Sequence, residues 1–324
     1  MKRITLRSTM ISVLFWLVLS LPLVARAQGS RTDSAASYFN RGNDWIKKGE
    51  WERAIDDFSM AIAFNPKLAS AYFNRGYARE AKADLDGAMA DYNRALAIDP
   101  TYADAYIKRG NLFIRRREVY EAINDYTRAL ELNPKMGEAW NNRGSARISR
   151  GDFEGALADC QQAQRLNPRL PDAWNTCGFA RYELGDLDGA LADFNRAVRL
   201  DPRFVLGYVN RGDTRRAKGD LDGALADFNM ALSLDPKLAI ARYRRGDIQF
   251  RKNNYQAALA DFDAALVLDK TMWQVWWNRG LTNILLERYD EAERDFTRCL
   301  SLNPVNRAEL EGLLKDLRQM RIKK

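Results

Sequence analysis

The chain contains no histidine among its 324 residues. Without histidine there is no Ser-His-Asp triad, no Cys-His pair and no histidine-ligated metal. The sequence also lacks a Cys-x-x-Cys pair, a phosphate-binding glycine loop and the Gly-x-Ser-x-Gly and Ser-x-x-Lys motifs. These absences argue against the main enzyme classes, so we expect a protein that is not an enzyme, with no catalytic residues, no metal and no cofactor.

Basic and acidic residues are nearly balanced over most of the chain. The formal net charge is +8, but residues 1–27 hold four basic residues and no acid, which leaves +4 for the remainder. No block of five or more basic residues occurs. Weak basicity of this kind is typical of solvated helix surfaces, so we expect no nucleic-acid partner.

Only one long apolar run is present, from Met10 to Val24. Basic residues precede it, and Ala25-Arg26-Ala27 follows with small residues at the positions that a signal peptidase reads. We interpret residues 1–27 as a signal peptide cleaved after Ala27, followed by a linker at 28–34. The alternative is an uncleaved anchor, but the run is shorter than the roughly 20 residues that a membrane span needs. The predicted location is periplasmic or secreted, with no stable membrane span after cleavage.

Glycine recurs every 34 residues, at Gly42, Gly76, Gly110, Gly144, Gly178, Gly212, Gly246 and Gly280. A fixed period near this length indicates one supersecondary unit repeated as a stack. The glycines define eight repeats, at residues 35–68, 69–102, 103–136, 137–170, 171–204, 205–238, 239–272 and 273–306. Repeat position 1 is the seventh residue before each glycine, so the glycine is position 8.

Other positions of the repeat are restricted to small, aromatic or proline residues. Position 20 is always Ala, position 24 is aromatic except for Cys160, and position 32 is Pro except for Lys270. Positions 4, 8 and 11 share one helical face and positions 20, 24 and 27 share another, which predicts two closely packed helices per repeat. Glycines at position 15 and aspartates at position 16 predict the end of the first helix and the N-cap of the second: Gly151, Gly185, Gly219, Asp152, Asp186 and Asp220.

This pattern resembles the tetratricopeptide repeat (TPR) family over all eight repeats. The resemblance implies an all-α fold, a right-handed superhelical solenoid of antiparallel helix pairs whose concave groove binds peptides or proteins. Residues 307–324 keep helical apolar spacing at Leu310, Leu313, Leu314 and Leu317, and we expect them to form a C-terminal capping helix.

Two opposite charges recur with the period. Arginine occupies position 7 at Arg41, Arg75, Arg109, Arg143, Arg211, Arg245 and Arg279, and aspartate occupies position 23 at Asp57, Asp91, Asp125, Asp159, Asp193, Asp227, Asp261 and Asp295. We interpret them as structural ion pairs, formed either within a repeat or between repeats. The alternative is an arginine ladder that faces an anionic ligand. Four further arginines replace the usual aromatic residue at position 11, so this position is not expected to be wholly buried.

Two of the three cysteines interrupt these patterns at one junction. Cys160 replaces the aromatic residue of the fourth repeat, and Cys177 replaces the arginine of the fifth. The geometry implied by the resemblance places both near the same contact between repeats. A disulfide between them is our hypothesis for an exported protein, and a pair of buried thiols is the alternative.

The resemblance also implies which side chains line the groove. Position 6 points away from the packed face, and it carries Asn40, Asn74, Lys108, Asn142, Asn210, Arg244 and Asn278; Tyr77 and Asn111 lie nearby at position 9. An amide can donate to a peptide carbonyl and accept from a peptide N–H, so these asparagines could hold an extended peptide. Alternatively they follow the repeat template and contact water.

We therefore expect an exported scaffold or adaptor that binds a peptide or partner protein, with a role in envelope assembly or secretion. One alternative is a non-catalytic accessory subunit of an envelope enzyme complex. The least favoured alternative is a nucleic-acid-binding helical repeat.

Overall fold

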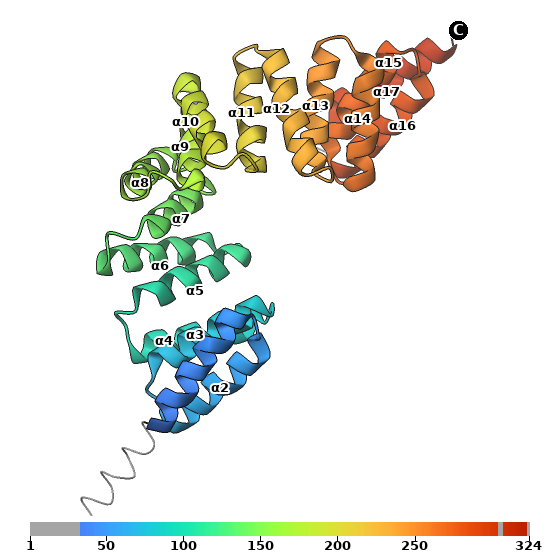
Figure 1. The fold of residues 1–324 in the computed structure, drawn as a ribbon. Coiled ribbons are helices and arrows are strands. Elements are labelled where there is room, and N and C mark those ends of the chain that lie inside the picture. Colours follow the sequence, from blue (N-terminus) through green and yellow to red (C-terminus); the bar gives the residue numbers. More distant parts are fainter. Residues whose placement is uncertain (1–32, 304–306, 323–324) are drawn as a thin grey trace, which may run out of the picture. The chain divides into compact units, whose positions relative to one another are not determined.

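The computed structural model describes residues 33–303 and 307–322, and within these ranges it contains helices and no strand (Figure 1). The predicted signal peptide and most of the predicted linker lie outside them. The chain forms two compact units, the first ending at Ala146 and the second starting at Arg147. Each unit is described on its own.

Each repeat contributes two helices. The first unit holds helical residues 33–48, α2 (Trp51–Phe64), α3 (Ala69–Ala81), α4 (Leu85–Ile98), α5 (Ala103–Arg115), α6 (Val119–Leu132) and most of α7 (Gly137–Ile148). The second unit continues with α8 (Phe153–Leu166), α9 (Pro171–Glu183), α10 (Leu187–Leu200), α11 (Val205–Ala217), α12 (Leu221–Leu234), α13 (Ala239–Arg251), α14 (Tyr255–Leu268), α15 (Trp273–Leu285), α16 (Tyr289–Leu302) and α17 (Arg307–Ile322).

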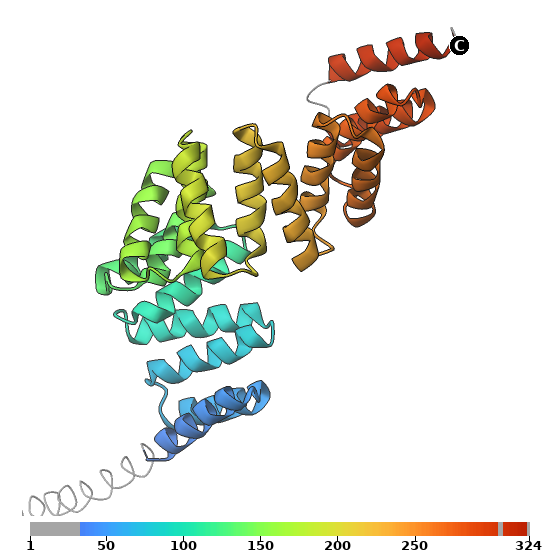
Figure 2. The ribbon, with the colours of Figure 1, turned by 45° about the horizontal axis from the view of Figure 1, so that its top comes forward.

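Consecutive helices pack on one another, from α2 to α6 in the first unit and from α8 to α17 in the second (Figure 2). In the second unit α9, α11, α13 and α15 also contact one another in sequence. These are the first helices of repeats five to eight, so their side chains share one continuous face. We call it the first-helix face and define it by repeat positions 5, 6, 9, 12 and 13.

The glycine at position 8 allows the two helices of a repeat to approach closely. A Cβ built on Gly178 would lie 2.7 Å from Cε1 of Phe194, the aromatic residue at position 24 of the same repeat. The ring itself is 1% exposed, and the alanines at positions 20 and 27 of this repeat, Ala190 and Ala197, are fully buried. The period of the glycines therefore reflects a steric requirement.

The turn between the two helices has the same backbone in every repeat. Position 15 adopts a positive φ in all eight, although glycine occupies only four: Gly49, Gly151, Gly185 and Gly219, against Ala83, Arg117, Asn253 and Glu287. The predicted caps at Asp152, Asp186 and Asp220 are confirmed, since each carboxylate accepts from the backbone N–H three residues later. Asp84 caps α4 in the same way.

The last repeat is covered by α17. Leu310, Leu314 and Leu317 are buried against Phe296 and Cys299 of α16, with Trp273 and Trp277 of α15 packed at the edge of the same cluster. The predicted fold class is confirmed: an all-α stack of helix pairs of the solenoid type, closed by a C-terminal helix. No helix among the described residues combines the length and apolarity required to span a membrane.

Candidate functional site

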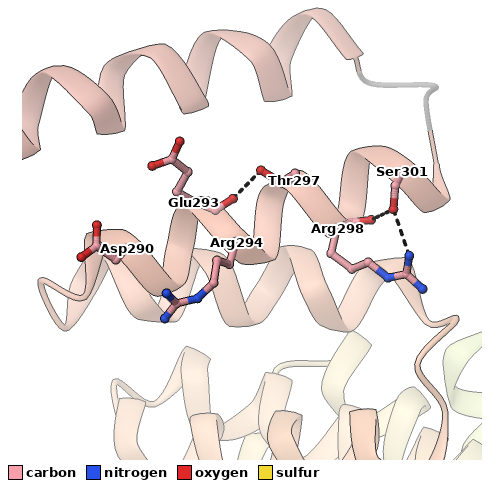
Figure 3. A pocket seen from close by; sticks show the side chains of 6 residues that line it. All are labelled: Asp290, Glu293, Arg294, Thr297, Arg298 and Ser301. Carbon is pink, nitrogen blue, oxygen red and sulfur yellow. Dashed lines mark hydrogen bonds between the residues drawn. The ribbon is translucent and has the colours of Figure 1, made fainter.

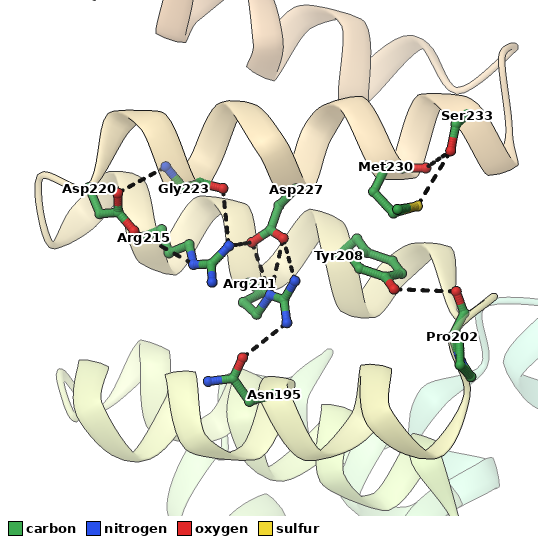
Figure 4. A network of polar contacts seen from close by, with 10 residues as sticks. All are labelled: Asn195, Pro202, Tyr208, Arg211, Arg215, Asp220, Gly223, Asp227, Met230 and Ser233. Carbon is green, nitrogen blue, oxygen red and sulfur yellow. Dashed lines mark hydrogen bonds and ion pairs between the residues drawn. The ribbon is translucent and has the colours of Figure 1, made fainter.

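The arginines at position 7 lie between the two helices of a repeat and the repeat before it. Arg211 donates from Nη2 to Asp227 Oδ1 at 2.5 Å, within its own repeat, and from Nη1 to Asn195 Oδ1 at 3.0 Å, in the preceding repeat (Figure 4). Arg215, at position 11, donates to Asp227 Oδ2 at 2.8 Å and to the carbonyl of Gly223 at 3.1 Å. One buried carboxylate therefore holds two guanidinium groups.

The same arrangement recurs along the chain. Position 7 pairs with position 23 in Arg41–Asp57, Arg75–Asp91, Arg109–Asp125, Arg245–Asp261 and Arg279–Asp295. Position 7 also donates to position 25 of the preceding repeat, at Ser59, Asn93, Thr127, Asn229 and Asp263. The contacts are thus both within and between repeats. Each of these arginines is engaged with its own framework, and this arrangement does not support a ladder that faces a ligand.

Position 11 supplies a second donor to the same carboxylate in most repeats. Arg79, Arg147 and Arg181 reach Asp91, Asp159 and Asp193 at 2.6–2.8 Å, and Trp45 and Asn283 take this role at the two ends of the stack. The arginines here are about one-quarter exposed, which agrees with the expectation that position 11 is not wholly buried.

The fifth repeat lacks the arginine at position 7, and a disulfide stands in its place. Cys177 is bonded to Cys160 of the preceding repeat, with the two Cα atoms 5.5 Å apart, and Cys299 is a free buried thiol. Asp193 consequently has Arg181 as its guanidinium partner. Burial raises the pKa of Asp193 to about 6, although Arg181 opposes the shift.

The asparagines at position 6 join successive first helices. Asn74 donates to Asn43 Oδ1 at 2.6 Å, Asn142 to Asn111 Oδ1 at 3.1 Å, and Asn210 to Asn175 Oδ1 at 2.8 Å. Asn278 donates to the hydroxyl of Tyr243 at 3.3 Å. Each bond uses one amide N–H of the donor, so each of the four donating asparagines retains a second N–H for another molecule. Asn40, in the first repeat, is exposed.

These bonds reveal a longer period that the sequence analysis missed. The asparagines that donate from position 6 belong to even-numbered repeats, whereas repeats three and seven carry Lys108 and Arg244 at that position. The Nζ atom of Lys108 lies 5.2 Å from the ring centroid of Tyr77, and Arg244 contacts Asp213. In both cases the cation reaches position 9 of the preceding repeat. Reading odd and even repeats separately would have exposed this alternation.

One site on the first-helix face lies across repeats five, six and seven. A cavity of about 280 Å³ is lined there by Phe179, Tyr182, Glu183, Phe194, Asn210, Asp213, Arg216 and Arg244. Of these, Asn210 and Arg244 belong to the groove predicted from the sequence. Phe179 and Asp213 lie at position 9, which the predicted groove already included through Tyr77 and Asn111. The remaining residues lie at positions 12, 13 and 24, which the predicted groove did not include.

A buried acid lies between two arginines in this cavity. Asp213 is 3.5 Å from Nε of Arg216 and 3.3 Å from Nε of Arg244. These ion-pair contacts do not satisfy hydrogen-bond geometry, and Asp213 Oδ1 and both Nε atoms are buried without a hydrogen-bond partner among the residues that the structure describes. Burial raises the pKa of Asp213, and the two arginines oppose that rise. Glu183 also lines the cavity, so its two arginines and two carboxylates balance in charge beside three aromatic side chains. The two buried Nε–H groups are suited to an acceptor oxygen next to an apolar group.

Family models for tetratricopeptide repeats match residues 107–171, 178–239, 211–272 and 243–306, and a second TPR repeat model matches residues 42–82 and 81–115. The chain belongs to the tetratricopeptide repeat family. Comparison with curated proteins finds no match for this TPR chain.

Solved TPR structures share the fold at low sequence identity. A tetratricopeptide repeat protein from Parabacteroides merdae is 22% identical, with a TM-score of 0.61 over 77% of this chain and 99% of that one. The APC/C hetero-tetramer Cut9–Hcn1 gives 18% identity and a TM-score of 0.67 over 82% of this chain and 52% of that one. PilF from Pseudomonas aeruginosa gives 17% identity and a TM-score of 0.59, over 68% and 99% respectively. These likenesses concern the fold alone.

Proposed function

We propose that this TPR protein is a non-catalytic scaffold that binds a peptide or a segment of a partner protein along its first-helix face. The observation that carries the proposal is the cavity of repeats five to seven, where three successive repeats contribute side chains to one site. TPR proteins are generally scaffolds without catalytic activity, and nothing in the residue set of this cavity resembles a nucleophile with its base.

The cavity has the mixed character of a peptide-binding site. Phe179 and Tyr182 offer apolar surface, whereas Arg216 and Arg244 offer guanidinium donors. Asp213 and Glu183 balance these charges, and Asp213 keeps both guanidinium groups close to the cavity. A bound segment would place an apolar side chain against the rings and a carbonyl or carboxylate oxygen near the arginines, while Asn210 keeps an amide available for its backbone.

Selection from a random peptide library against the purified protein tests the proposal. The double variant R216A/R244A removes both guanidinium groups, and the single variant R203A, which removes an exposed arginine from the loop before α11, serves as the control. We expect selected peptides to bind the wild type and R203A alike and to lose binding to R216A/R244A. Equal binding to all three proteins would place the ligand elsewhere.

We also propose that the protein is exported and serves in the cell envelope. The basic, apolar and small-residue order of residues 1–27 supports export. The Cys160–Cys177 bond supports an oxidising compartment, because disulfides persist there and are rare in the cytosol. N-terminal sequencing of the natural protein tests this directly: a chain that starts at Gln28 is expected, and one that starts at Met1 would contradict cleavage.

A further inference from the structure

The repeats provide an internal standard against which the eighth one differs. Position 16 carries an acid or asparagine in the first seven repeats: Glu50, Asp84, Glu118, Asp152, Asp186, Asp220 and Asn254. The eighth repeat has Arg288 there. Position 22 is uncharged or acidic in the first seven repeats, at Asp56, Ala90, Asn124, Ala158, Ala192, Ala226 and Ala260, and the eighth has Arg294. Both differences introduce a positive charge.

Arg288 breaks a local rule of helix stability. It is the N-cap residue of α16, and its side chain makes no capping hydrogen bond. A cation at this end of a helix opposes the helix dipole, and arginine cannot accept from the exposed N–H groups as aspartate does. A residue that destabilises the helix it begins, with no compensating contact nearby, is a candidate for a functional role.

The two extra arginines face one cavity. It measures about 440 Å³ and lies between α14, α15 and α16, where Arg279, Arg288, Arg294 and Arg298 contribute four guanidinium groups. Arg294 and Arg298 are four residues apart and project from the same side of α16 (Figure 3). A neighbouring cavity of about 660 Å³ follows the same helix, and there the two arginines are accompanied by Asp290 and Glu293.

Three of the four guanidinium groups have unused donors. Arg279 is held by Asp295 and Asp263 at 2.5 and 2.6 Å. Arg294 is 3.2 Å from Glu291, and Arg298 donates to the Ser301 hydroxyl at 3.3 Å. Arg288 makes no side-chain hydrogen bond or ion pair with a described residue. Since Asp263 and Asp295 are taken up by Arg279, Glu291 is the remaining carboxylate of the cavity facing three arginines.

We propose that this arginine cluster of the eighth repeat binds a phosphate group. A phosphate offers at least three acceptor oxygens to guanidinium groups that approach from different sides, whereas a carboxylate offers two oxygens in one plane. The cluster lies outside the first-helix face, so the phosphate and the peptide would occupy separate sites. The phosphate could be free in solution or belong to a lipid headgroup.

Calorimetric titration of the purified protein with pyrophosphate tests the site. The variant R288A/R294A is compared with R94A/R128A, which removes two arginines from position 26 of other repeats and so makes the same change in net charge. We expect R288A/R294A to weaken binding by about tenfold or more and R94A/R128A to change it by less than about twofold. Absence of binding to pyrophosphate and to vesicles, or equal losses in the two variants, would overturn the proposal.

Cosedimentation with phosphatidylcholine vesicles, with and without phosphatidylglycerol, separates the two sources. Binding to free pyrophosphate without cosedimentation supports a soluble phosphate. Cosedimentation that requires phosphatidylglycerol and is lost in R288A/R294A supports a lipid headgroup. The melting temperature of unliganded R288A/R294A is measured alongside, so that a loss of binding is distinguished from a loss of the fold. R288A removes an unfavourable N-cap residue and is expected to leave the fold intact.

Discussion

Cys177 is bonded to Cys160 at the junction where six other repeats of this TPR stack use an arginine to reach the preceding repeat. The disulfide closes a short loop of the chain, with a sequence separation of 17. Removing a bond that closes a loop of this length lowers the stability of the fold by about 3 kcal/mol in the chain-entropy description. The disulfide thus links the fourth and fifth repeats at the place where an arginine makes the contact elsewhere in the stack.

The first prediction concerns this bond. The variant C160S/C177S should melt at a lower temperature than the wild type, and a reducing agent should lower the melting temperature of the wild type alone. Thiol titration of the unfolded protein before reduction should find one thiol, that of Cys299. Three thiols in the unreduced natural protein would contradict the disulfide.

The second prediction concerns the buried carboxylates at position 23. Asp227 holds Arg211 and Arg215, whereas Asp261 is bonded to Arg245 while Gln249 occupies position 11. D227A leaves two guanidinium groups without their carboxylate and should lower the free energy of unfolding by about 3–5 kcal/mol. D261A should cost clearly less in the same urea titration. Equal costs would show that the second arginine adds nothing.

The third prediction concerns the turn at position 15. A Cβ added at Gly151 meets nothing within 4 Å, so the effect of G151A reports the positive φ alone. We expect G151A to destabilise by about 1 kcal/mol and A83G to stabilise by about 0.5–1 kcal/mol, because non-glycine residues are strained in this region. Thermal unfolding of both variants checks the opposite signs, and a stabilising G151A would refute the argument.

The fourth prediction is a pH dependence from Asp193. Its pKa is about 6 in the fold against 3.8 ordinarily, so the folded state binds the proton more tightly. The contribution of Asp193 to stability therefore increases as the pH falls through 6 and is complete below 3.8. The wild type should gain stability relative to D193N between pH 7 and pH 4. Parallel urea titrations of both proteins measure this difference, and a constant difference would disprove the shift.

Much of the fold could be predicted because its main requirements are steric and periodic. Gly178 must be small since Phe194 lies against it, and that requirement repeats in the sequence as a period. The helix N-caps could be predicted for the same reason, because an aspartate such as Asp186 precedes the second helix at the same repeat position. The positive φ at Ala83 and Glu287 could not be predicted, because the turn imposes it on residues that do not favour it.

The site could be predicted only in part because partner choice depends on three-dimensional proximity. The period identifies Arg211 and Asp227 as partners, but only the structure shows that Arg211 also reaches Asn195 of the previous repeat. Asn210 and Arg244 occupy the same repeat position, yet the first bonds an amide and the second contacts a buried acid. A repeat position therefore predicts where a side chain lies better than it predicts what it binds.

Photo-crosslinking from the first-helix face tests the central claim most directly. A photoreactive phenylalanine analogue replaces Tyr182, in the cavity of repeats five to seven, or Tyr120, an exposed tyrosine on a second helix. With a labelled peptide selected against the protein, we predict a crosslink from position 182 that R216A/R244A abolishes, and none from position 120. Crosslinking from position 120 with none from position 182 would contradict a scaffold that binds through its first helices.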